Sequence, residues 1–228
     1  MTPEIIIVPT SHIARESLER VKDVISSAKP DCLAVELDFY RYRAMKSEGK
    51  ESGFAIMRSM GPLTYSLYWL LKKLQEHLGG KTGILPGSDM MKAADLGSEL
   101  GIPVAFIDQD IQTTFLGIKK IGLREKLKLI WLLIYGAIGM KLPLPGRKVE
   151  LDLNKVPEKE VVVQAIGMIK KELPGLYKVL IDDRNRHMAR KLITLSEKYG
   201  KIVCVIGAGH EDGIRKILES PRKGSTAI

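Results

Sequence analysis

The amino-acid sequence predicts an α/β fold in which a largely parallel or mixed sheet is flanked by helices. Four short apolar runs recur along the chain, and their lengths and composition are typical of strands buried on both faces. They span residues 4–8, 32–37, 104–107 and 202–206. Segments with helical patterns separate them, and strands that alternate with helices indicate a parallel sheet.

The first half of the chain places helices between these strands. A stripe of apolar residues spaced three or four positions apart predicts a helix over residues 14–28. A basic segment at 38–50 also has a helical pattern. Further helical patterns cover residues 53–78, with an interruption at Gly61-Pro62, and residues 88–100, with Ser88 as a candidate N-cap.

The second half is mostly helical until the last strand. A long helix is expected over residues 113–140, with a break at Gly122. Two helices with proline near the first turn follow at 157–173 and 174–199. A short helix over 211–218 closes the fold. We therefore expect one domain over residues 1–219, apolar helical insertions at 54–78 and 113–141, and a disordered tail at 220–228.

The composition restricts the partners and the compartment. The 228 residues carry a net charge of +9, which favours anionic ligands or surfaces. Nucleic acid is disfavoured, because the basic residues are spread over every helix and no nucleic-acid-reading motif appears. Cys32 and Cys204 lie inside predicted strands, so we expect free thiols in a reducing compartment. No signal peptide precedes the first strand, and we expect a cytoplasmic protein.

Two uncharged apolar runs leave an alternative open. Residues 59–71 and 129–140 are too short to span a bilayer, which needs about 20 apolar residues. They can pack on each other and on the sheet. Alternatively, they form a surface in peripheral contact with a membrane, since basic residues flank the second run.

Four polar side chains follow the predicted strands where each one ends. His12 comes after the first strand, Glu36 ends the second, Asp108 ends the third and His210 follows the last. In a parallel sheet these side chains emerge along one edge, where open α/β sheets bind their ligands. Two imidazoles and carboxylates at one place are ligands that a divalent ion requires.

Arg184 interrupts an apolar stripe on the helix predicted over 174–199. A guanidinium in that position needs a carboxylate or an anionic ligand. Pairing with Asp89 and contact with substrate both remain open. Asp183 and His187, four residues apart, lie off this stripe, and we expect an exposed helix contact there.

Short motifs along most of the chain resemble the TraB family, the pheromone-shutdown proteins related to the Tiki peptidases. The motifs, in chain order, are Pro9-Thr10-Ser11-His12, Val35-Glu36-Leu37-Asp38 with Arg41, Gly87-Ser88-Asp89-Met90, Ile107-Asp108-Gln109-Asp110, Asp183-Arg184 with Met188-Ala189, and Gly207-Ala208-Gly209-His210 with Gly213-Ile214. The resemblance implies the fold shared by erythromycin esterases and the ChaN-like haem-associated lipoproteins. It also implies a metal-dependent hydrolase whose signature is two Gly-x-x-His motifs and a glutamate.

Three positions depart from the pattern of that family. Pro9 stands where the first motif has glycine, Asp89 where glutamate is usual, and Gln109 where arginine is usual. Pro9 alters the backbone but leaves His12 in the sequence, so a metal site can still form with this histidine. Gln109 removes a positive charge close to the site, which bears on the class of substrate.

The resulting hypothesis is a hydrolase that binds a divalent ion, manganese, cobalt or zinc, through His12, Glu36 and His210. Glu36 or Asp108 would act as ligand or general base, and Arg184 would hold an anionic group or the developing oxyanion. Arg41 and Asp89 complete the expected substrate-binding residues, together with Arg184. The substrate would be a peptide or another small acyl compound.

The rival hypothesis is a peptide-binding or membrane-associated interaction protein without catalysis. In that case the histidines and acids would be structural, held by backbone partners. The oligomeric state is open, and a homodimer is among the options.

Overall fold

The structure is a computed structural model that describes residues 3–10, 15–46, 88–137 and 159–220. Its centre is a four-stranded sheet with the strand order β1-β4-β2-β3, in which every pair is parallel. The strands are β1 (Glu4–Thr10), β2 (Cys32–Val35), β3 (Val104–Phe106) and β4 (Lys201–Gly207). The α/β class and the parallel sheet predicted from the apolar runs are confirmed.

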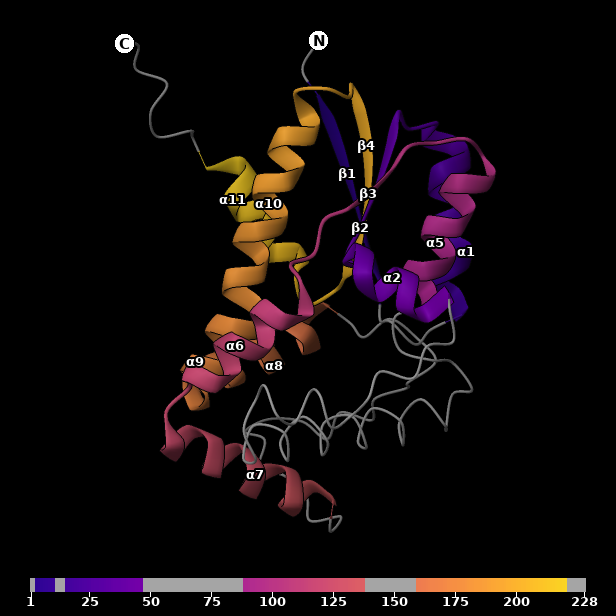
Figure 1. The fold of residues 1–228 in the computed structure, drawn as a ribbon. Helices are drawn as coiled ribbons and strands as arrows, with labels where there is room; N and C mark the ends of the chain where they lie inside the picture. Colours follow the sequence, from indigo (N-terminus) through magenta and orange to yellow (C-terminus); the bar gives the residue numbers. More distant parts are fainter. Residues whose placement is uncertain (1–2, 11–14, 47–87, 138–158, 221–228) are drawn as a thin grey trace.

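Helices cover both faces of this sheet (Figure 1). On one side lie α1 (Arg15–Ala28) and α5 (Ser88–Glu99), and on the other lie α10 (Asp183–Ser196) and α11 (Glu211–Glu219). Strand residues alternate between the two layers because successive side chains point to opposite faces. In β4, Cys204 packs towards α10 and α11, whereas Val203 and Val205 pack towards α1 and α5.

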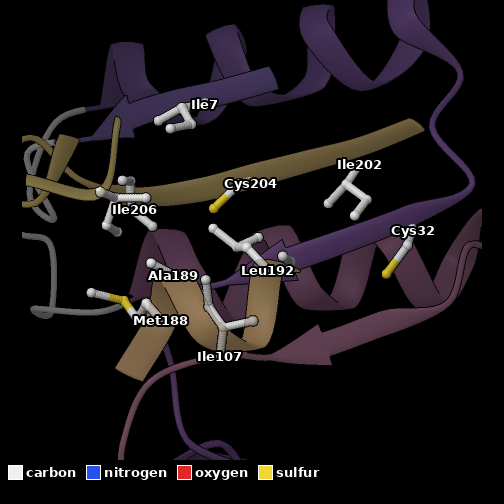
Figure 2. Packing of buried hydrophobic residues seen from close by; sticks show 11 residues of the cluster. Ile7, Cys32, Ile107, Met188, Ala189, Leu192, Ile202, Cys204 and Ile206 are labelled. Atoms are coloured by element: carbon white, nitrogen blue, oxygen red, sulfur yellow. The ribbon is translucent and has the colours of Figure 1, made fainter. Parts of the chain in front are cut away.

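The layer under α10 is a closely packed apolar core. Figure 2 shows Cys204, Ile206 and Ile202 from β4 facing Met188, Ala189 and Leu192 of α10. All six side chains are buried completely. This packing fixes α10 against the sheet, so the residues at the start of α10 are held close to the ends of the strands.

The first strand extends further than the apolar run predicts. The run indicates an end at Val8, but β1 continues to Thr10, and Pro9 pairs with Ile206 in register. Proline cannot donate to a sheet ladder, so it is tolerated in edge strands. β1 is such a strand in the described sheet, where β4 is its one neighbour.

The remaining described helices lie beyond the strand ends. They are α2 (Phe39–Lys46), α6 (Ile111–Lys120), α7 (Leu123–Ala137), α8 (Lys159–Glu172), α9 (Pro174–Tyr177) and the π-helical segment η1 (Lys178–Asp182). A small apolar cluster joins four of them through Ile118, Leu129, Leu176 and Val179. The break predicted at Gly122 is confirmed, because α6 ends at Lys120 and α7 begins at Leu123.

The helix predicted over 174–199 contains a local irregularity. α9, η1 and α10 follow one another without a gap, and the π-helical turn ends immediately before Asp183. Such turns often occur at functional sites. The sequence pattern did not indicate it.

Several expectations concern parts of the chain outside the described residues. These are the apolar insertion at 54–78, the last residues of the insertion at 113–141, and all but the first residue of the tail at 220–228. No helix in the described part of the chain combines the length and the apolar character needed to cross a bilayer.

Candidate functional site

Three of the four predicted strand-end residues lie together at the carboxyl edge of the sheet. Glu36 follows β2, Asp108 lies two residues after β3, and His210 lies three residues after β4. Each of these side chains is at least 95% buried. The fourth residue, His12, lies outside the described residues.

Arg184 connects two of these carboxylates. Its Nε donates to Asp108 Oδ1 and its Nη2 to Asp108 Oδ2, both at 2.9 Å, which is a bidentate pair. The same Nη2 also donates to Glu36 Oε1. Sequence reasoning weighed Asp89 as the partner of Arg184, whereas the structure gives it Asp108 and Glu36. Both carboxylates reach Arg184 because they follow strands of the sheet against which α10 packs.

The charges of this cluster stabilise one another. Burial alone would lower the pKa of the Arg184 guanidinium, but the carboxylates of Glu36 and Asp108 raise it above its ordinary value. The arginine therefore stays protonated at any ordinary pH. Arg184 is therefore a permanent cation between two buried carboxylates.

Glu36 is held from three directions. Its Oε2 accepts the backbone N–H of Gly207 at 2.6 Å, and its Oε1 accepts Arg184. On the side of the last strand, His210 Nε2 lies 3.3 Å from Glu36 Oε1. Glu36 is thereby the centre of the site, because it contacts both the arginine and the imidazole.

Asn185 sets the orientation of the His210 ring. The amide oxygen Oδ1 of Asn185 lies 2.7 Å from His210 Nδ1. An amide oxygen can only accept, so Nδ1 carries the proton. In the neutral ring Nε2 then presents a lone pair towards Glu36 Oε1. Two acceptors at this separation require either a proton between them, on the ring or on the carboxyl group, or a cation bound by both.

Gly213 makes room for this contact. A Cβ atom at position 213 would lie 2.1 Å from Asn185 Nδ2, too close for two heavy atoms. The glycine of α11 therefore allows Asn185 of α10 to reach His210. Sequence reasoning missed Asn185, although a signal was present: it lies three and four residues before the buried Met188 and Ala189, on the buried face of the helix.

A second arginine lies at the rim of the cluster. Arg41 Nη1 is 3.7 Å from Asp108 Oδ2, and the Arg41 backbone N–H donates to Asp38 Oδ1 at 2.9 Å. Burial raises the pKa of Asp38, although the N–H and the charge of Arg41 partly oppose it. The Arg41 side chain is 37% exposed, against 18% for Arg184. Of the two arginines, Arg41 is the more accessible from solvent.

Asp89 is placed at the start of α5, where it is buried. Its Oδ1 accepts the backbone N–H of Met90 at 2.9 Å. This contact satisfies one of the N–H groups at the start of the helix, the role of an acidic residue in a first turn.

Comparison with known proteins agrees with this arrangement of motifs. A family model described as the TraB/PrgY/gumN family matches residues 2–225. The chain belongs to the TraB/PrgY/gumN family. The resemblance seen in the sequence motifs is thus confirmed.

A curated relative within the TraB/PrgY/gumN family is also similar over nearly the whole chain. The uncharacterized protein MJ1365 of Methanocaldococcus jannaschii is 33% identical over 225 residues. The match covers 97% of this chain and 55% of that protein. The chain therefore spans about half the length of the curated relative that it matches.

The donor set of this TraB/PrgY/gumN chain fits part of a metal site. Within the described ranges, no three His, Cys, Asp or Glu side chains form a group that could hold an ion. Glu36 and His210 supply one oxygen and one nitrogen, 3.3 Å apart. Two ligands each about 2.0–2.2 Å from a tetrahedral zinc ion are separated by roughly this distance. The pair fits two positions of a coordination shell, and further ligands would come from elsewhere.

Proposed function

We propose that the protein is a metal-dependent hydrolase that acts on peptides or other small acyl compounds. The observation that carries the proposal is the approach of His210 Nε2 to Glu36 Oε1, with Asn185 holding the proton on Nδ1. Metal-ligating histidines characteristically donate their other ring N–H to such an acceptor. The finer fold assignment, the one shared with erythromycin esterases and ChaN-like proteins, is part of the same proposal and rests on the resemblance.

The ligands in this proposal are Glu36, His210 and His12. His12 comes two residues after the end of β1, and β1 pairs with the strand that leads to His210. A bound manganese, cobalt or zinc ion would polarise the substrate carbonyl and lower the pKa of water.

The contacts of the described residues favour distinct roles for the two carboxylates. Asp108 Oδ1 accepts Arg184 Nε and the backbone N–H of Gln109, and its Oδ2 accepts Arg184 Nη2. Asp108 then acts as a positioning residue that fixes the guanidinium, and the guanidinium fixes Glu36. In this scheme Arg184 is also a positioning residue, because its Nε and Nη2 are directed at carboxylates.

Arg41 is the better candidate for contact with an anionic part of the substrate. Its side chain is the more exposed of the two arginines, and it lies beside Asp108 at the rim of the cluster. The overall charge of +9 would also favour an anionic substrate.

The decisive experiment measures the metal content of untagged protein. Wild-type protein should carry about one divalent ion per chain, and His210→Ala should lose it while keeping its circular dichroism spectrum. His187→Ala is the matched control, since His187 lies on the face of α10 near α6, and it should keep the ion. Stoichiometric metal in His210→Ala refutes the assignment. Cleavage of a peptide library with added manganese, cobalt or zinc then separates a hydrolase from a peptide-binding protein.

An exposed apolar stripe favours a second candidate, an interaction protein at a membrane. Leu123, Leu127 and Trp131 are spaced four residues apart on α7 and are 61%, 53% and 59% exposed. Basic residues flank them, as in helices that lie in the surface of anionic membranes. Flotation with anionic vesicles tests this candidate: wild-type protein should co-migrate, and Trp131→Ser should reduce the bound fraction. Absence of co-migration by wild-type protein eliminates it.

A further inference from the structure

A cleft of about 280 Å³ opens between α6 and the η1–α10 helix. It begins one residue after Asp108, at Gln109, but the side chains that line it are not those of the Glu36–His210 pair. Thr113 of α6 faces it from one side, and Asp183, His187 and Arg190 of α10 face it from the other. Its volume is near the lower end of ligand pockets, which are roughly 300–1,000 Å³. The cleft therefore suits a small ligand.

Close packing fixes the shape of the cleft. A Cβ atom at Gly117 would lie 2.8 Å from Val179 Cγ1, so α6 and η1 are in direct contact at that end. Near the strand edge, Gln109 is buried, and its Nε2 donates to Thr114 Oγ1 at 2.9 Å. The walls are thus set by contacts within the protein and do not depend on a ligand.

The positive charge in the cleft exceeds the negative charge. Asp183 Oδ1 is paired with Lys178 Nζ at 2.5 Å, and Asp182 Oδ2 with Arg186 Nη2 at 3.1 Å. Arg190 Nε donates to the Arg186 carbonyl oxygen at 3.2 Å, and the described residues give its guanidinium no carboxylate. Within the described part of the chain, one arginine charge is therefore left without an acid to balance it.

The excess of positive charge in the cleft affects His187. Burial is the largest cause that lowers its pKa, and the charges of Lys191 and Arg190 lower it further. The ring is thus neutral at pH 7, and the cleft's positive charge comes from arginine. Its buried Nε2 has no hydrogen-bond partner among the described residues.

We propose that this cleft binds a small oxyanion, a phosphate or a carboxylate group, through Arg190 and the hydroxyl of Thr113. A guanidinium donates to either oxyanion in a charge-assisted hydrogen bond, and a hydroxyl adds a neutral donor. The proposal does not depend on metal binding at Glu36 and His210 or on hydrolysis. It assigns a separate anion site on the helical side of Asp108.

The test titrates the full chain with inorganic phosphate and, separately, with acetate, at constant ionic strength, following backbone amide NMR shifts around residues 109–117. Arg190→Gln should weaken binding about tenfold or more, the usual effect of losing a charge-assisted hydrogen bond. Thr113→Val should weaken it by a smaller factor. The matched control is Arg20→Gln, which removes the same charge from exposed α1 on the other face of the sheet and should leave binding unchanged.

The titrations can support or overturn the anion site. Saturable shifts with phosphate alone or acetate alone, lost in Arg190→Gln, support the site and identify its ligand class. Absence of saturable binding by both probes, or equal weakening by Arg20→Gln and Arg190→Gln, overturns it. The titration is repeated on His210→Ala, where unchanged affinity supports a cleft distinct from a metal centre, and lost affinity overturns it.

Discussion

Among single residues, Gly213 and Asn185 control the position of the His210 ring. The amide of Asn185 is buried and held by His210, so it cannot easily turn away from a new side chain at position 213. A cluster of this kind tolerates little change in volume, because extra atoms in a packed interior force neighbouring groups to shift.

We predict that Gly213→Ala lowers the free energy of unfolding by about 1–3 kcal/mol, since the added Cβ would displace Asn185. The matched control is Gly209→Ala. There the nearest atom to an added Cβ is Ile166 Cδ1 at 3.7 Å, an ordinary contact. Its free energy of unfolding should change by about 0.5 kcal/mol or less. Guanidinium denaturation of both variants is the measurement, and equal stability would contradict the account.

A second prediction concerns Arg184. Arg184→Gln should lower the free energy of unfolding by about 3–5 kcal/mol, because it leaves the buried carboxylates of Asp108 and Glu36 without their cation. Arg215→Gln removes the same group from a partly exposed i,i+4 pair with Glu211 and should cost about 0.5 kcal/mol or less. Urea denaturation at pH 7 measures both. A loss at Arg184 as small as that at Arg215 would show that the buried cluster adds nothing to stability.

The element that most affects the site is the continuous helix formed by α9, η1 and α10. Its sheet-facing side carries Arg184 and Asn185, and its other side carries His187 towards the cleft. Both sides connect to Asp108, since the Asp108 side chain accepts Arg184 and its backbone hydrogen-bonds to His187.

The lowered pKa of His187 makes the stability of the fold depend on pH. Its pKa in the folded chain lies below the ordinary value of 6.5, so between those two values the unfolded chain binds a proton that the folded chain does not. The part of the free energy of unfolding that is linked to His187 is therefore fully present above about pH 6.5. It is lost as the pH falls from that value through the lower pKa of the folded chain. Denaturation of wild-type protein and His187→Gln at pH 7.5 and 5.5 tests this. The drop should be smaller in the variant, and identical drops would contradict the assignment.

Sequence patterns predicted the elements well where burial decides them. The charge-free runs in β2 and β4 correctly predicted strands. Such runs occur there because helices cover both faces of the sheet. Sequence patterns failed where contacts between distant parts of the chain determine the end of a strand or the partner of a side chain. The first apolar run indicated a strand that ends at Val8, but β1 continues through Pro9 to Thr10. The partners of Arg184 are separated from it by 76 and 148 residues, a relation that helical spacing cannot reveal.

On the scale of the whole molecule, the sheet is enclosed by two helical layers, and both cysteines lie inside. Burial raises the pKa of Cys32 to about 11, and burial also raises the pKa of Cys204 above its ordinary value. The thiolate is the reactive form, so both groups should be inert while the layers stay packed.

We therefore predict that both thiols react only slowly with Ellman's reagent in folded protein at pH 8, and that both react rapidly in concentrated guanidinium. Access requires separation of a helical layer from the sheet, so the slow reaction under native conditions should follow the rate of opening. Rapid reaction of one or both thiols in the folded protein would contradict the enclosed sheet.

The convergence of strand ends was predictable from topology alone, because parallel strands bring their carboxyl ends to one edge. Glu36, Asp108 and His210 follow that rule. Asn185 and Arg41 lie on helices, α10 and α2, and their contacts in the site depend on how those helices pack. His12 stays a prediction, since it lies outside the described residues.

The central claim is that one divalent ion binds at Glu36 and His210, and the most direct measurement is anomalous diffraction from crystals grown with manganese, cobalt or zinc. The account predicts an anomalous peak roughly 2.0–2.2 Å from both His210 Nε2 and a Glu36 carboxylate oxygen. Crystals in which His210 Nε2 donates directly to Glu36, with no anomalous peak beside either residue at saturating metal, would contradict it.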